Sequence, residues 1–209
     1  MAPDLLPLYH RKIRVFGLLN NRPPLPEGET LGPLMEDFLA GVRFHLAVDR
    51  EFHSQPFFER FSHGLAQGFQ TASGPKGLKL FFPAHLLSEM YFDHLLITRH
   101  PGWTDELYQV IRDVGRETLT EFTQGHPLAS PQGVNRFVGI LLADRFLEDY
   151  REPEGLFFRA GRILAKCHQR QLTAEEQQAA TGYLKRNGPQ VWPDLWEFIG
   201  AMRQKASHP

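Results

Sequence analysis

Residues 34–49 read Leu-Met-Glu-Asp-Phe-Leu-Ala-Gly-Val-Arg-Phe-His-Leu-Ala-Val-Asp, and the spacing of their apolar side chains predicts a helix. Leu34, Phe38 and Val42 recur every four residues, which is the pattern of an amphipathic helix with one buried face. Gly41 falls inside this run and is a point at which the helix could bend or divide. Helical patterning begins here and continues to the end of the chain.

The preceding segment, residues 1–33, has a different character. Its six prolines fix the backbone φ angle and remove hydrogen-bond donors, so no long helix can run through it. We therefore expect residues 1–33 to form an irregular, proline-rich segment packed on a single helical domain of residues 34–209.

Capping and turn signals divide that domain into further helices. Ser54 before Pro56 marks a helix start, and Thr173 with Glu176 has the spacing of a capping box. Asn187-Gly188-Pro189 predicts the end of the helix that the box opens. The other expected helices are 83–100, 104–125, 131–150, 152–169 and a last one around Trp192 and Trp196, whose rings we expect in the core. The fold class is all-α, with seven or eight helices.

Composition limits the possible functions. The formal net charge is −1, so the whole chain has no electrostatic preference for nucleic acid. Cys167 is the single cysteine, so an intrachain disulfide is impossible and we read the thiol as structural. No stretch approaches the length of an apolar membrane span, and the first residues do not resemble a secretion signal. We expect a cytoplasmic protein of undetermined oligomeric state.

The first helix carries groups that could bind a metal. His45, Asp49 and His53 follow one another at one-turn spacing and so share a helix face, with Asp37 shortly before them.

The second helix repeats this arrangement with His85, Glu89 and Asp93, and His94 comes next. Facing helices that present carboxylates and imidazoles are a common way to build a metal site in a helical protein. Without a thiolate, such a site suits Mn²⁺, Fe²⁺ or Mg²⁺ better than structural zinc. A solvated helix face is the alternative interpretation. The apolar residues that flank both groups favour burial, and buried charges need partners or a metal.

A third feature is a basic stripe. Arg159, Arg162, Lys166 and Arg170 follow spacings of three and four along one helix. A solvated face is the ordinary interpretation, and a docking strip for an acidic partner is the alternative.

Several of these segments resemble the acyl carrier protein phosphodiesterase family. Residues 34–49 are similar to its Leu-Ala-Asp-Phe segment followed by Gly-Ile-His-x-His-x-x-Ile-Asp. Residues 89–95, Glu-Met-Tyr-Phe-Asp-His-Leu, resemble its Asp-x-x-x-Asp-His-Phe-Leu element. Looser matches at residues 146–150 and 155–161 extend the resemblance over most of the chain from residue 31.

The resemblance implies an α-helical fold distantly related to the HD-domain phosphohydrolases. It also implies Mn²⁺-dependent hydrolysis that removes 4′-phosphopantetheine from holo-acyl carrier protein, an acidic partner. Carried over by position, it assigns catalytic or metal-binding roles to Asp37, His45, Asp49, Glu89, Asp93 and His94. Substrate contacts are expected from Arg43, Arg159, Arg162 and Lys166.

The sequence departs from the family pattern at three places. Arg43 stands where the family has the first histidine of its His-x-His pair, and Glu89 replaces an aspartate. The family's opening Asn-Phe-Leu-Ala-His has no clear counterpart, and His10 is a poor match. Arginine cannot bind a metal, but it can hold a phosphate through two hydrogen bonds. Two alternatives therefore stay open: a phosphohydrolase with another phosphoester substrate, such as a nucleotide, and a catalytically silent binding protein with the same fold.

Overall fold

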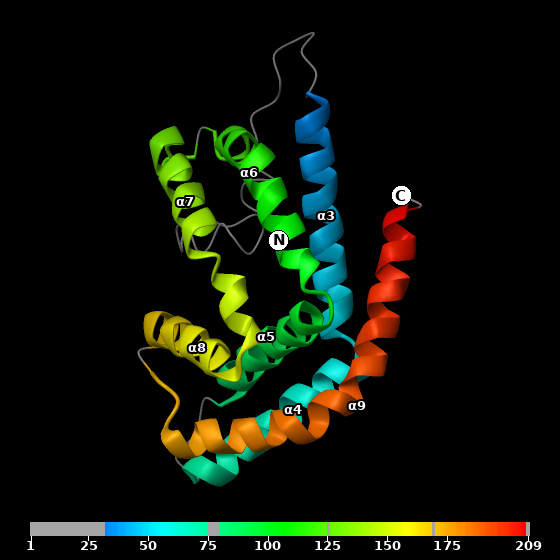
Figure 1. Ribbon diagram of the computed structural model, residues 1–209, viewed down its shortest axis with the longest axis vertical. Helices are drawn as coiled ribbons and strands as arrows, with labels where there is room; N and C mark the ends of the chain where they lie inside the picture. Colours follow the sequence, from blue (N-terminus) through cyan, green and yellow to red (C-terminus); the bar gives the residue numbers. More distant parts are fainter. Residues whose placement is uncertain (1–31, 75–79, 125, 169, 208–209) are drawn as a thin grey trace. The chain divides into compact units, whose positions relative to one another are not determined.

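The computed structural model describes residues 32–74, 80–124, 126–168 and 170–207, with the side chains of 167, 168 and 207 left out (Figure 1). The expected irregular segment, residues 1–33, lies almost entirely outside these ranges, and so does the side chain of Cys167. Within them the chain forms seven α-helices and one 3₁₀ helix, and no strand. The all-α prediction is confirmed.

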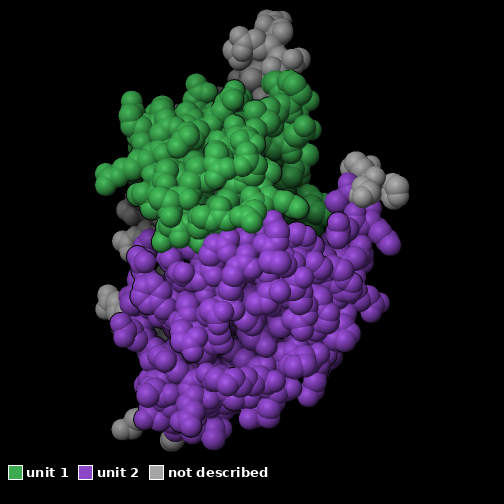
Figure 2. Space-filling model, in the orientation of Figure 1, with its two compact units in different colours: residues 1–50, 105–145 green, residues 51–104, 146–209 purple. Residues whose placement is uncertain are grey.

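The described residues fall into two compact units, which Figure 2 colours separately. Unit 1 contains the described residues up to Arg50 together with Asp105–Arg145, and unit 2 contains Glu51–Thr104 and the described residues from Phe146. Each unit therefore combines two separate stretches of the chain.

Unit 1 is built from most of α3 (Pro33–His53), most of α6 (Gly102–Phe122) and α7 (Pro131–Asp144). Helix α3 has a buried apolar face, but it is formed by Met35, Leu39 and Val42. The predicted stripe shares only Val42 with it, because Leu34 is 39% exposed. Phe38 contacts Phe122 of α6 edge to face, with ring centroids 5.2 Å apart. Apolar burial of this kind is the main source of stability for a helical unit of this size.

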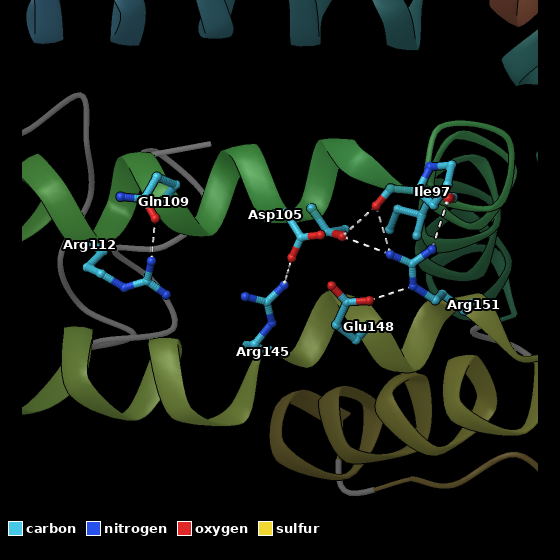
Figure 3. Close-up of polar contacts among 9 residues, drawn as sticks. Ile97, Asp105, Gln109, Arg112, Arg145, Glu148 and Arg151 are labelled. Carbon is cyan, nitrogen blue, oxygen red and sulfur yellow. Dashed lines mark hydrogen bonds and ion pairs between the residues drawn. The ribbon is translucent and has the colours of Figure 1, made fainter.

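Helix α7 begins where the sequence predicts and ends earlier. The Ser130 hydroxyl caps its start by accepting from the Gly133 amide at 3.1 Å. The prediction that this helix runs to Tyr150 is wrong, because Arg145 adopts a left-handed φ of 42°. The Arg145 side chain compensates for that unfavourable backbone by pairing with Asp105 at 2.5 Å, as Figure 3 shows, and by lying 4.5 Å above the ring of Tyr108.

Unit 2 contains α4 (Pro56–Ser73), α5 (Phe81–Arg99), the 3₁₀ helix η1 (Phe146–Arg151), α8 (Pro153–His168) and α9 (Ala174–Ser207). Helix α5 is central, because it packs against α4, η1, α8 and α9. Arg151 of η1 fastens the end of α5 by donating to the Ile97 carbonyl at 3.3 Å and to the Pro101 carbonyl at 2.9 Å (Figure 3). The bond to Ile97 satisfies one of the carbonyls that the end of α5 leaves without a partner, and the bond to Pro101 holds the turn that follows.

The start of α4 differs in detail from the prediction. Gln55, not Ser54, is the residue before the helix, and it makes no side-chain cap. The Ser54 hydroxyl instead donates to the Glu51 carbonyl at 2.7 Å, at the end of α3. Pro56 in the first turn is as expected.

The predicted helix end at Asn187-Gly188-Pro189 is wrong, because α9 continues through Pro189 and Pro193. Figure 1 shows α9 bending strongly between its two halves, and proline is the usual cause of such a bend. Close to this bend the Tyr91 hydroxyl of α5 donates to the Leu184 carbonyl at 3.1 Å, which ties α9 to α5.

The tryptophans on α9 are only partly in the core. Trp196 is 38% exposed and stacks on His100, with ring centroids 4.7 Å apart. The expectation that both rings are core residues is therefore wrong for Trp196. No helix in the described ranges has both the length and the apolar character needed to cross a membrane.

Candidate metal site

Three side chains of unit 2 meet where the end of α3 approaches the first half of α5. His53 comes from the last turn of α3, and His85 and Glu89 lie one turn apart on α5. One ligand atom from each, an imidazole nitrogen or a carboxylate oxygen, lies within 4.8 Å of the other two. Within the ranges that the structure describes, this is the one group of at least three such residues with that geometry.

Both imidazoles reach the same carboxylate oxygen. Nε2 of His53 lies 2.7 Å from Oε1 of Glu89, and Nε2 of His85 lies 3.0 Å from it. Burial opposes ionisation of Glu89, but the hydrogen bonds and charges of the two histidines outweigh it, so the pKa of Glu89 lies below its usual value. The three ligand atoms therefore already converge around a negative charge.

Aromatic rings wall the cluster. The buried ring of Phe58 meets the imidazoles of His53 and His85 edge-on, at centroid distances of 4.8 and 5.0 Å. The two imidazoles are 4.8 Å apart. An apolar wall excludes water from one side and strengthens the electrostatic interactions within the cluster.

One polar atom of the cluster has no partner. Nδ1 of His85 is buried and makes no hydrogen bond in the described structure. A buried nitrogen of this kind needs an explanation such as a bound ion, a water molecule or a catalytic role. In most metal-binding histidines the N–H of the second ring nitrogen donates a hydrogen bond that orients the ring. His85 would bind the metal without such a hydrogen bond.

The donor set fits a divalent metal. Two imidazole nitrogens and one carboxylate oxygen suit Mn²⁺, Fe²⁺ or Zn²⁺, and three protein ligands leave coordination positions for water and substrate. The three residues could thus hold a catalytic ion and not only a structural one.

The ligand set expected from the sequence overlaps this cluster at a single residue. Glu89 belongs to it. His53 and His85 share helix faces with the residues expected from the sequence, but neither is one of the five expected ligands. Those five are His45, Asp49, Glu89, Asp93 and His94.

The four expected residues on α3 lie in unit 1, before the boundary between the two units. Asp37, Arg43 and Asp49 are exposed, and His45 is half-buried. Asp93 on α5 is also exposed. The expectation that apolar neighbours bury these acids is wrong, because the neighbours point inward from other faces of the same helices.

His94 has a defined environment on α5. Its Nδ1 lies 2.7 Å from the Tyr150 carbonyl, to which it can donate, and its ring stacks on Tyr91 at 5.3 Å. This hydrogen bond orients the imidazole and reserves Nε2 for other chemistry.

The sequence matches no family model and no curated protein, and no solved structure resembles the chain. The resemblance to the acyl carrier protein phosphodiesterases therefore stays a prediction.

Proposed function

We propose that this protein is a divalent-metal-dependent phosphodiester hydrolase that removes 4′-phosphopantetheine from holo-acyl carrier protein. The observation that supports the hydrolase chemistry is the convergence of His53, His85 and Glu89 on one point. The resemblance of residues 34–49 and 89–95 supports the choice of substrate.

In this proposal the three residues hold the ion, with Mn²⁺ as the expected metal. A divalent ion supplies a water of lowered pKa and offsets negative charge on the phosphate. Glu89 contributes the anionic ligand, and its lowered pKa keeps it ionised at neutral pH.

The reaction adds water to phosphorus and breaks the bond to the carrier-protein serine oxygen. The products are the serine hydroxyl and free 4′-phosphopantetheine, so the serine oxygen must gain a proton. Asp93 and His94 follow Glu89 on α5, and we propose that one of them delivers this proton. The Tyr150 carbonyl supports His94 in that role, because the hydrogen bond at Nδ1 fixes the orientation of the ring and leaves Nε2 to face the substrate.

The proposal is tested by incubating the purified protein with holo-acyl carrier protein and Mn²⁺ and measuring release of phosphopantetheine by mass spectrometry. We expect release by the wild type, loss of release with a chelator, and a decrease of at least about a hundredfold in Glu89→Gln. His63→Ala is the matched control, because His63 is an exposed histidine outside the cluster. A wild type that retains no stoichiometric metal and releases nothing would identify a silent binding protein instead.

A further inference from the structure

The basic stripe on α8 is partly neutralised within the chain. Arg159 is 13% exposed, and its Nε donates to Oδ2 of Asp149 at 2.6 Å. Arg170 pairs with the buried carboxylate of Glu176. Both arginines therefore make ion pairs within unit 2 and are not available to bind a partner.

The other two cations of the stripe point to solvent. Arg162 and Lys166 are exposed, and so is Lys185 on the first half of α9. None of the three makes an ion pair within the described part of the chain. Two of these exposed cations, Arg162 on α8 and Lys185 on α9, line one groove.

A groove lies between these two helices, which Figure 1 shows on the same side of unit 2. It is open to solvent and has a volume of about 660 Å³. Phe157, Phe158 and Leu172 provide apolar lining, and Arg162 and Lys185 provide positive charge. Phe158 is 58% exposed, and the Arg162 guanidinium lies 5.8 Å from the centroid of its ring.

We infer that this groove docks an acidic, amphipathic helix of a partner protein. Apolar side chains of that helix would cover Phe158, and its carboxylates would pair with Arg162 and Lys185. Exposed aromatic and arginine side chains are the residue types that dominate binding energy at protein interfaces. The inference rests on the proposed function in one respect: that function identifies the partner protein as the acyl carrier protein.

A nucleic acid strand is the less favoured occupant. Glu154 lines the same groove and would repel phosphates, and the whole chain has a net charge of −1. Strand binding without sequence preference generally uses a continuous positive track, which the two cations of the groove do not form.

The test is a direct binding measurement with fluorescently labelled acyl carrier protein, followed by anisotropy. The groove variant carries Arg162→Glu and Lys185→Glu. The control variant carries Arg116→Glu and Arg136→Glu, which make the same change in net charge at exposed positions of unit 1. We expect Kd to rise at least about tenfold in the groove variant and to stay within about twofold in the control. Binding to the wild type should weaken when salt rises from about 0.05 M to about 0.5 M.

Equal binding by both variants would overturn the inference, and so would an absence of binding to the wild type. Competition of a single-stranded oligonucleotide for the same groove would also overturn it, in favour of nucleic acid. A second measurement, hydrolysis of the small substrate bis(4-nitrophenyl) phosphate, tests the chemistry of the proposed function separately, because this substrate has no helix to dock in the groove. Unchanged hydrolysis in the groove variant with weakened carrier-protein binding supports docking. If the wild type does not hydrolyse this substrate, the proposed function is contradicted. The docking inference is then decided by the binding measurement alone.

Discussion

The ring of Tyr91 occupies the space that a side chain at Gly188 would need, so that a Cβ there would overlap the Tyr91 hydroxyl and ring. The two residues come from α5 and from the middle of α9. Their contact brings the Tyr91 hydroxyl to the Leu184 carbonyl, one turn before Gly188 on α9. Gly188 is therefore required for close packing and not for an unusual backbone angle.

Gly188→Ala should destabilise unit 2 by about 2 kcal/mol, because overpacking in a closed site displaces the tyrosine. Gly200→Ala is the matched control, since it lies in the same helix with no atom within 4 Å of a new Cβ. Alanine there should stabilise by up to about 1 kcal/mol. Urea denaturation measures both effects, and equal midpoints for the two variants would contradict the packing argument.

A second prediction concerns Glu176, whose side chain is 1% exposed. Its carboxylate accepts from the Thr173 amide at 2.9 Å and from the side chains of Arg170 and Ser73. Glu176→Ala should cost about 1–3 kcal/mol, because the Thr173 amide and the Ser73 hydroxyl lose their acceptor while Arg170, which is partly exposed, can be solvated. Glu175→Ala, at the neighbouring exposed position, should change the denaturation midpoint little. A small effect at both positions would contradict this role for Glu176.

A third prediction follows from Tyr183, whose pKa is raised by burial. The protonated form is favoured in the folded state, so this contribution is complete below the unfolded pKa of about 10 and is lost as the pH rises above it. The free energy of unfolding should therefore fall more steeply above about pH 10 in the wild type than in Tyr183→Phe. Parallel decreases in the two proteins would show that other groups cause the alkaline loss.

Local signals explain which parts of the fold were predictable. The capping box of Thr173 and Glu176 is present as predicted, with the Thr173 hydroxyl accepting from the Glu176 amide at 3.2 Å. Its partners are three residues apart, so the sequence contains the whole motif. The same holds for Ser130 at the start of α7.

The continuation of α9 was not predictable in this way. Gly188-Pro189 is a common local stop signal, but α9 continues through it. Tyr91 packs against Gly188 there and bonds to Leu184, which is 93 positions away in sequence. Arg145, whose backbone is left-handed, likewise pairs with a residue distant in sequence, Asp105, 40 positions away. Local sequence patterns give no signal for contacts between residues so far apart, so neither feature was predictable from them.

The candidate site lies between these two extremes. One-turn spacing identified the helix faces that carry His53, His85 and Glu89. Which turns of the two helices meet depends on the packing of α3 against α5, and spacing cannot specify it. The sequence prediction therefore names His45 and Asp49, which precede His53 on α3, and Asp93 and His94, which follow Glu89 on α5.

The last prediction tests the ligand set independently of activity. An ion that binds only the folded state stabilises it, by about 2.7 kcal/mol at a concentration of one hundred times Kd. For a chain of this length that shift corresponds to roughly 5–10 °C in Tm. We expect Mn²⁺ to raise Tm in the wild type and to have almost no effect in His53→Ala and His85→Ala. His45→Ala, which removes a ligand expected from the sequence, should keep the full shift, and so should His63→Ala. Calorimetric scans with and without Mn²⁺ decide between the two ligand sets, because loss of the shift in His45→Ala with retention in His85→Ala would move the ion to the site predicted from sequence. Since each scan without metal reports the stability of the variant itself, a folding defect is distinguished from loss of the ion.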